Sequence, residues 1–295
     1  MISYKPLLPL LAVLFLGKSA AKAQGQLMSD SLTQITHSID GLLGVAITDV
    51  RSGETTLLHG HDHQPMMSVF KFPLALYILD QADKGKLSLD EPFIIRKASW
   101  KMYSPLLNRY PGDTVRLTLR DLTANIILLS DNVACDVLLQ RIGGPRVLND
   151  YVHGLGIKEI NIAYTETQMA DDPQRVYDNW CTPAAMNILL QRFYEHHILS
   201  DTGTGQLLQW MIQSTPYPHR LKGLLPPDIV VAHKPGTSNT DSTGLTAATN
   251  DVGILTLPGG AHLYVTVFLA NSHADLATRE HAIALVGRLA ASSKY

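Results

Sequence analysis

One serine and one charged residue stand in an otherwise apolar segment of this sequence. In PMMSVFKFPLALYIL, which runs from Pro65 to Leu79, they are Ser68 and Lys71. Lysine is rarely buried without a partner. Three positions apart on a helix, the two side chains share a face, with Cβ atoms about 5–6 Å apart. A desolvated lysine can lose its proton more easily and activate a serine. The pair indicates nucleophilic chemistry, although a surface lysine beside a capping serine explains the same spacing.

Three further groups of residues could join this chemistry. Ser130-Asp131-Asn132 lies at the junction of two helical patterns, where these residue types are also good helix N-caps. Lys234 ends a strand-like run and is followed by Pro235-Gly236-Thr237. Glu166 lies in a long polar stretch between Ile162 and Trp180. Chance accounts for any one motif more easily than for all of them together.

The order S-x-x-K, S-D-N and a K-[ST]-G-like triplet resembles the serine β-lactamases and penicillin-binding proteins. Glu166 points within that group to the class A β-lactamases. The resemblance covers essentially the whole chain after its leader, including MSVFKFPLAL, SDNVACD, TAATNDVGI and YVTVFLA. It is greatest to the extended-spectrum subgroup with the PER, VEB and CfxA types.

The resemblance implies a covalent mechanism with four catalytic residues. Ser68 would open the lactam and become acylated, and Lys71 would take or relay its proton. Ser130 would pass a proton to the departing lactam nitrogen. Glu166 would activate the water that hydrolyses the acyl-enzyme, and its part in acylation is disputed for the family.

The resemblance also assigns the contacts to substrate. Backbone N–H groups of Ser68 and Thr237 would form the oxyanion hole. The substrate carboxylate would be attracted by Lys234 and Arg220, and Asn132 would hold the amide side chain. The implied substrate-binding residues are Asn132, Lys234, Thr237, Arg220, Tyr103 (the aromatic wall) and Ser238.

The sequence departs from the family pattern near the site. Pro235 replaces a hydroxyl residue and removes a backbone N–H, which would cost a ladder bond on an inner strand. Thr237 and Ser238 would substitute in part for the lost hydroxyl. Ala170 replaces the usual asparagine after the catalytic glutamate.

The polar stretch that carries Glu166 departs as well. Tyr164 and Asn179 stand where an Arg–Asp pair usually closes the loop. Asp136 resembles a residue that bonds this loop in the subgroup. We expect a wider cleft that admits bulky oxyimino-cephalosporins.

The pattern of elements predicts an α+β fold in which both termini build one antiparallel sheet. Residues 24–64 and 215–295 would form the α/β lobe, residues 65–214 an inserted all-helical lobe, and the site would lie in the cleft between them. A hairpin is expected over residues 43–60, with neither helix nor strand over 162–180. The other expected helices are 68–86, 118–129, 131–144, 182–197 and 275–292, and the other expected strands are 228–234, 243–251, 252–258 and 262–271.

The N-terminus has the features of a secretory signal. Lys5 precedes an apolar run from Leu7 to Leu16, and Ala21-Lys22-Ala23 suits a cleavage site before Gln24. We therefore expect residues 1–23 to be removed and the protein to reach the bacterial periplasm, free of the membrane. Export permits a disulfide, but the two cysteines, Cys135 and Cys181, are expected to be unpaired thiols.

Composition and charge limit the remaining function classes. A net charge of −2 with scattered Lys and Arg argues against a nucleic-acid partner. A monomer without cofactor, acting on small β-lactams, is expected. HGHDH, from His59 to His63, offers a competing zinc hypothesis because His and Asp are good zinc ligands. A cell-wall DD-peptidase and a sensor that stays acylated would both use the same acylation chemistry, so both remain possible functions.

Overall fold

The computed structural model describes residues 27–102 and 104–292. The expected signal peptide and Tyr103 therefore lie outside the described residues.

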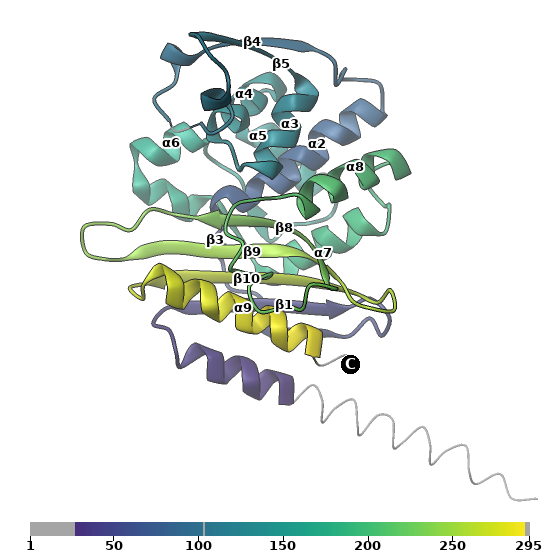
Figure 1. The fold of residues 1–295 in the computed structure, drawn as a ribbon, viewed down its shortest axis with the longest axis vertical. Coiled ribbons are helices and arrows are strands. Elements are labelled where there is room, and N and C mark those ends of the chain that lie inside the picture. Colours follow the sequence, from purple (N-terminus) through teal and green to yellow (C-terminus); the bar gives the residue numbers. More distant parts are fainter. Residues whose placement is uncertain (1–26, 103, 293–295) are drawn as a thin grey trace, which may run out of the picture.

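A five-stranded antiparallel sheet forms the centre of the molecule, with strand order β2-β1-β10-β9-β8 (Figure 1). The expected hairpin is confirmed as β1 (Leu42–Asp49) and β2 (Thr55–Leu58). The last three strands come from the other end of the chain: β8 (Val230–Thr237), β9 (Thr246–Thr256) and β10 (His262–Ser272). Both ends of the chain thus build one sheet, as expected, and β8 is left as an edge strand.

Alternating side chains divide the core between the two faces of this sheet. On β10, Val265 and Val267 pack with α9 (Leu276–Ser292) and the helix over residues 27–36, whereas Tyr264 and Phe268 pack with the other helices. The period of two in side-chain direction explains this division. One face of the sheet is therefore free to approach the inserted helices (Figure 1).

Seven further α-helices, with four 3₁₀ turns, account for most of the segment between β2 and β8 among the described residues. Their caps follow from the sequence: Thr118 and Asp121 form a capping box on α3, and Thr182 caps α7 ahead of Pro183. The helices are α2 (Lys71–Asp83), α3 (Leu119–Leu128), α4 (Asn132–Ile142), α5 (Pro145–Gly154), α6 (Glu166–Asp171), α7 (Pro183–Tyr194) and α8 (Asp201–Ile212), and the turns are η1 (Met67–Phe70), η2 (Lys97–Ser99), η3 (Leu107–Arg109) and η4 (Pro173–Asp178).

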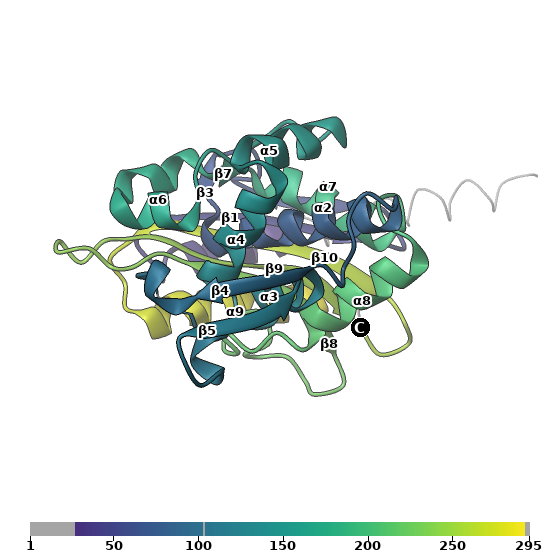
Figure 2. The same cartoon turned by 90° about the horizontal axis from the view of Figure 1, so that it is seen from above.

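The expectation of an all-helical inserted lobe is wrong. Strands β4 (Pro92–Arg96) and β5 (Thr114–Thr118) pair as an antiparallel hairpin, seen side by side in Figure 2. The alternation of β5 is present in the sequence, since Val115 and Leu117 are buried while Thr114 and Arg116 are exposed, whereas the run Phe93-Ile94-Ile95 gives β4 no alternation. A second small sheet joins β3 (Gln64–Pro65), β7 (Trp180–Cys181) and β6 (Ile160–Asn161).

The structure differs from the expected elements in two other segments. The strands expected over 243–251 and 252–258 are one strand, β9, because the turn-type residues at the junction, Asn250, Asp251 and Gly253, pair with β8 on one side and β10 on the other. Residues 162–180 are ordered into α6 and η4. Side-chain caps explain these two short elements, since Thr165 and Gln168 form a capping box and Asp172 caps η4.

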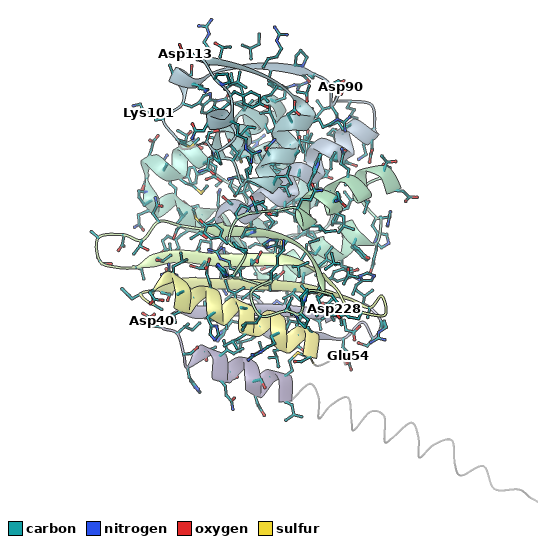
Figure 3. All side chains as sticks on the ribbon, viewed as in Figure 1. Asp40, Glu54, Asp90, Lys101, Asp113 and Asp228 are labelled. Atoms are coloured by element: carbon teal, nitrogen blue, oxygen red, sulfur yellow. The ribbon has the colours of Figure 1, made fainter. Side chains whose placement is uncertain are left out.

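Charged side chains mark the outside of the molecule, as they usually do. The six labelled in Figure 3 are all exposed and lie toward its two ends: Asp40, Glu54, Asp90, Lys101, Asp113 and Asp228.

Cys135 and Cys181 are free and buried, so two unpaired thiols are confirmed. Burial raises the pKa of both thiols. Among the described residues, no helix is both long and apolar enough to cross a membrane.

Candidate active site

Ser68 lies in a tight turn that leads into the first long helix of the inserted segment. The 3₁₀ turn η1 contains Ser68 and is followed at once by α2, whose first residue is Lys71. Met67 adopts φ +47°, a left-handed backbone conformation that is uncommon for a non-glycine residue. Strain of this kind persists only where the surrounding structure enforces it, and it is frequent at active sites.

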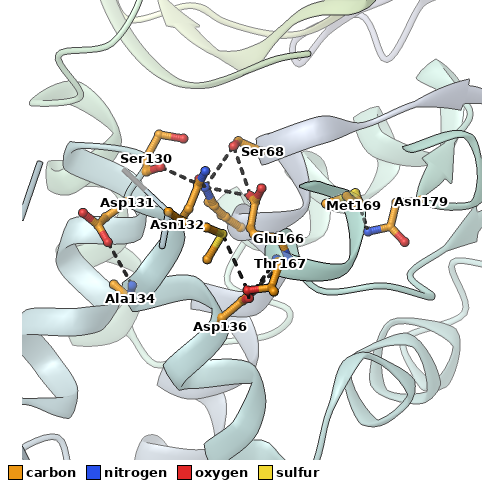
Figure 4. A network of polar contacts seen from close by, with 12 residues as sticks. Ser68, Ser130, Asp131, Asn132, Ala134, Asp136, Glu166, Thr167, Met169 and Asn179 are labelled. Atoms are coloured by element: carbon orange, nitrogen blue, oxygen red, sulfur yellow. Dashed lines mark hydrogen bonds and ion pairs between the residues drawn. The ribbon is translucent and has the colours of Figure 1, made fainter. Parts of the chain in front are cut away.

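Lys71 is fully buried, and its ammonium group lies among four oxygen atoms. Nζ is 2.9 Å from Ser68 Oγ, 2.8 Å from the Ser130 carbonyl oxygen, 2.5 Å from Asn132 Oδ1 and 2.8 Å from Glu166 Oε1. An ammonium has three N–H donors, so four acceptors compete for three protons. The serine–lysine pair of the sequence thus belongs to one polar cluster. Figure 4 labels Ser68, Asn132 and Glu166 of this cluster.

The turn between α3 and α4 supplies Ser130 and Asn132. Asp131 caps α4 by accepting from Ala134 N, so the capping interpretation of this motif is also correct. The other oxygen of Asp131 accepts from Ser104 Oγ and Leu106 N at 2.6 and 2.9 Å. With the turn held on both sides, Ser130 adopts φ +56° and directs its carbonyl oxygen to Lys71.

Glu166 is the first residue of α6 and is buried against Ser68 and Lys71. Ser68 Oγ donates to Glu166 Oε1 at 3.3 Å. Asp136, on α4, accepts from Glu166 N at 2.8 Å, and its other oxygen accepts from both the backbone N and the hydroxyl of Thr167. Burial raises the pKa of Asp136 even though these donors oppose the shift. The contact expected between Asp136 and this loop is therefore present.

Asn179 holds the other side of the same loop. Its Oδ1 accepts from Ala163 N and Tyr164 N, and its Nδ2 donates to the Tyr164 carbonyl. Asn179 is fully buried, so it closes the loop with neutral hydrogen bonds in place of an ion pair. Ala170 is exposed and lacks a polar side-chain atom with which to contact Glu166.

Strand β8 passes beside the Ser68 turn along the free edge of the sheet. Ser238 N donates inward to the Ala248 carbonyl, and antiparallel ladders alternate, so Thr237 and Pro235 lie at positions whose backbone N atoms face away from β9. Pro235 therefore removes no ladder bond, unlike a proline on an inner strand. The N–H of Thr237 faces outward, as an oxyanion-hole donor must.

Lys234 extends from β8 toward Ser130. Its Nζ donates to Ser130 Oγ at 2.9 Å and to the Pro235 carbonyl at 2.6 Å, and neither acceptor is a carboxylate. Burial and the neighbouring Lys71 cation both lower the pKa of Lys234 well below its ordinary value. A substrate carboxylate placed here would offset the cost of burying that charge.

Arg220 and Ser238 are more involved in the fold than the sequence indicated. Arg220 is fully buried, and its guanidinium donates to Thr237 Oγ1, to the carbonyls of Gly236 and Asn250, and to Glu280. Ser238 Oγ accepts from Ala248 N at 3.0 Å. Arg220 can therefore influence a ligand most directly through the Thr237 hydroxyl.

The hydroxyl and amide groups of the site are more exposed than its charged groups. Ser68, Ser130 and Asn132 are half-buried, whereas Lys71, Lys234 and Glu166 are buried. The hydroxyl and amide groups of the site thus reach the surface, and its charged groups are more deeply buried.

The histidine-rich segment forms separate exposed pairs. His59 pairs with Asp62, while His63 pairs with Glu159 and stacks on Trp180. In the described part of the chain, no group of three or more His, Cys, Asp or Glu side chains is placed to hold a metal ion. The zinc interpretation gains no support from this geometry.

Sequence reasoning missed several residues that position the site. Asp131 was visible as a cap, but its bonds to Ser104 and Leu106 have no sequence signal. A Cβ added to Gly236 would lie 2.6 Å from the Met66 carbonyl oxygen, which shows how closely β8 approaches the Ser68 turn. Asn250, on β9, donates to the backbone just before that turn.

Comparison with known proteins agrees with this geometry. A family model described as the β-lactamase enzyme family matches residues 28–293. The extended-spectrum β-lactamase PER-1 of Pseudomonas aeruginosa is 39% identical over 91% of this chain and 87% of its own length. β-Lactamase VEB-1 of the same organism is 34% identical over 97% of this chain and 96% of its own length. The likeness to PER and VEB types is therefore confirmed.

Solved structures give the same result. A β-lactamase from Chitinophaga pinensis superposes with a TM-score of 0.88 and 41% identity, covering 91% of this chain and 99% of its own. A class A β-lactamase from Bacteroides cellulosilyticus gives a TM-score of 0.87 and 31% identity, covering 92% and 98%. The chain therefore belongs to the β-lactamase enzyme family, and within it to the class A enzymes.

Proposed function

We propose that this protein hydrolyses β-lactam antibiotics through an acyl-enzyme formed on Ser68. One observation carries the proposal: the buried ammonium of Lys71 lies within hydrogen-bond distance of both Ser68 Oγ and Glu166 Oε1. A serine hydroxyl needs a base to become a nucleophile, and this arrangement provides one.

In acylation, Ser68 Oγ attacks the lactam carbonyl carbon, and Lys71 takes or relays its proton. The C–N bond of the lactam breaks as the tetrahedral intermediate collapses. Ser130 Oγ gives its proton to the departing nitrogen and regains one through Lys71, so the proton from Ser68 ends on that nitrogen while the Lys234 cation beside Ser130 keeps its charge. The N–H groups of Ser68 and Thr237 stabilise the oxyanion.

In deacylation, Glu166 accepts a proton from a water molecule that attacks the ester carbonyl. The carboxylate is held for this task by the bonds of Asp136 to the backbone of Glu166 and Thr167. Its position beside Ser68 favours a hydrolase over a DD-peptidase or a sensor that remains acylated.

Substrate binding uses half-buried hydroxyl and amide groups together with the buried Lys234. Lys234 and the Thr237 hydroxyl, supported by Arg220, bind the substrate carboxylate. Asn132 holds the amide side chain through the part of its amide not used by Lys71. Ser238 and Tyr103 would be further substrate contacts, as the resemblance implies.

We also propose an extended substrate range. The loop that carries Glu166 is closed by the neutral hydrogen bonds of Asn179 rather than by an ion pair. Ala170 has no polar side-chain atom, so Asp136 supplies the polar contact to Glu166. The relatives PER-1 and TLA-1 are named as extended-spectrum enzymes. Oxyimino-cephalosporins are therefore proposed substrates.

The same proposal covers location and domain division. Residues 1–23 serve as a signal peptide, and the mature monomer acts in the periplasm without a cofactor. The site lies between an α/β lobe of residues 24–64 and 215–295 and an inserted lobe of residues 65–214. Ser68 and Lys234 then come from opposite lobes.

Replacing the proposed deacylation base should trap the intermediate. After exposure to benzylpenicillin, the Glu166→Gln variant should accumulate an adduct of one penicillin mass on Ser68, whereas the wild type should return to its original mass. Intact-protein and peptide mass spectrometry measure both. Equal clearance of the adduct by the variant and the wild type would remove Glu166 from the mechanism.

The proposed substrate range is tested by comparing kcat/KM for cefotaxime and benzylpenicillin. We expect cefotaxime to be turned over with an efficiency within about a hundredfold of benzylpenicillin, a difference of about 2.7 kcal/mol in barrier. Negligible turnover of cefotaxime by an enzyme fully active on benzylpenicillin would exclude the extended range.

The charge on Lys234 should set an alkaline limit on activity. The cation binds the carboxylate and is lost as pH rises through its pKa, which is lowered, so kcat/KM should fall well below pH 10.5. Arginine stays protonated, so the falling limb should move to higher pH in Lys234→Arg. An identical alkaline limb in both proteins would assign it to another group.

A further inference from the structure

We propose that Asn250 is the positioning residue that sets the oxyanion hole, by fixing the Ser68 turn against strand β8. The proposal rests on the function proposed above, since it concerns the same two donors, the N–H groups of Ser68 and Thr237. These donors come from segments far apart in the sequence, so their separation must be set by contacts between the two segments.

The side chain of Asn250 is buried and bonded at both ends of its amide. Nδ2 donates to the Pro65 carbonyl at 2.8 Å and to the Met66 carbonyl at 3.1 Å. Oδ1 accepts from Leu269 N, on β10, at 3.3 Å. Because an N–H faces one end and two carbonyl oxygens face the other, only one orientation of the amide satisfies every group.

The carbonyls that Asn250 binds precede the nucleophile directly. Met66 N donates to the Asn179 carbonyl at 2.8 Å, so the Met66 residue is held from both sides. The next residue, Met67, has the left-handed φ of +47°. A conformation of this kind needs such restraint, because strained backbone persists only where neighbouring contacts enforce it. Asn250 therefore helps to maintain the turn that presents Ser68.

Asn250 also reaches the other half of the oxyanion hole through its backbone. It pairs with Gly236 across β8 and β9. One nitrogen of the Arg220 guanidinium, Nη1, donates both to the Asn250 carbonyl and to the Gly236 carbonyl, at 2.8 and 3.0 Å. Gly236 immediately precedes Thr237, whose N–H is the second donor.

The fit between the two segments is close at this point. A Cβ at Gly236 would lie 3.1 Å from Ser68 N and 2.6 Å from the Met66 carbonyl oxygen, so the backbones approach as nearly as glycine permits. Loss of one oxyanion donor typically costs about a hundredfold or more in rate. If the amide of Asn250 no longer holds Met66, the turn can move away from β8 and weaken both donors.

The test uses the acyl-enzyme carbonyl as a reporter of the oxyanion hole. In the Glu166→Gln background, the ester formed with a ¹³C-carbonyl-labelled penicillin gives an infrared band whose frequency falls as hydrogen bonds to the carbonyl strengthen. Asn250→Asp keeps the shape but has at most one donor for the two carbonyls, and Asn250→Ser has a hydroxyl too short to reach both carbonyls. Each variant is compared with the Glu166→Gln parent for the position of the infrared band, the acylation rate and the thermal unfolding temperature.

Asn187→Asp is the matched control. Asn187 is also a buried asparagine bonded to backbone and hydroxyl groups, but its partners are Thr48, Tyr264 and Thr266, away from Ser68. Its replacement should affect stability without affecting the reporter band.

We expect both Asn250 variants to form the adduct at least about tenfold more slowly, with the carbonyl band moved to higher frequency, while Asn187→Asp leaves the band unchanged. An unshifted band with unchanged acylation in either folded Asn250 variant would overturn the inference, and so would failure of both to fold. If the Glu166→Gln parent itself forms no adduct, the proposed function fails instead.

Discussion

A buried ammonium group is the constraint on which the rest of this site depends. Lys71 has no exposed surface, so its charge must be compensated by oxygen atoms that the protein supplies. Those oxygens come from Ser68 on η1, Ser130 and Asn132 at the junction of α3 and α4, and Glu166 on α6. Satisfying one lysine therefore brings together three segments that are distant in sequence. The same contacts place a carboxylate beside a serine, which is the chemical basis of the proposed hydrolysis.

The remaining elements hold these groups in place at a cost in local conformation. Met67 and Ser130 both have positive φ angles. Buried side chains donate to the carbonyl of Met66, just before Met67, and to the carbonyl of Ser130. Strand β8 approaches the Ser68 turn so closely that Gly236 cannot be replaced without movement. The place of β8 at the sheet edge also explains why Pro235 is tolerated, because the proline occupies a position whose N–H would face away from β9.

The sequence was sufficient for features that depend on local pattern. Apolar periodicity and caps predicted the long helices, and the spacing of Ser68 and Lys71 predicted that these two side chains meet. That Ser130 and Glu166 join them was implied by the resemblance to the β-lactamases, and the structure contains that cluster. The sequence was not sufficient where three-dimensional context decides. Strands β4 and β5 are only five residues long and give a weaker pattern than the neighbouring helices, and nothing in the chain showed that β8 is an edge strand. Asn250 illustrates the limit, since an asparagine inside a strand has no signal that identifies its partners 185 residues earlier.

A double-mutant cycle on Lys71 and Glu166 tests the central interaction most directly. The free energies of unfolding of Lys71→Met, Glu166→Gln and the double variant give the coupling between the two side chains. We predict a favourable coupling of about 2 kcal/mol or more, because each single change leaves a buried charge without its partner. The exposed pair Arg141–Glu91, measured in the same way, should give about 1 kcal/mol or less. Additive effects at Lys71 and Glu166, within about 0.5 kcal/mol, would contradict the account.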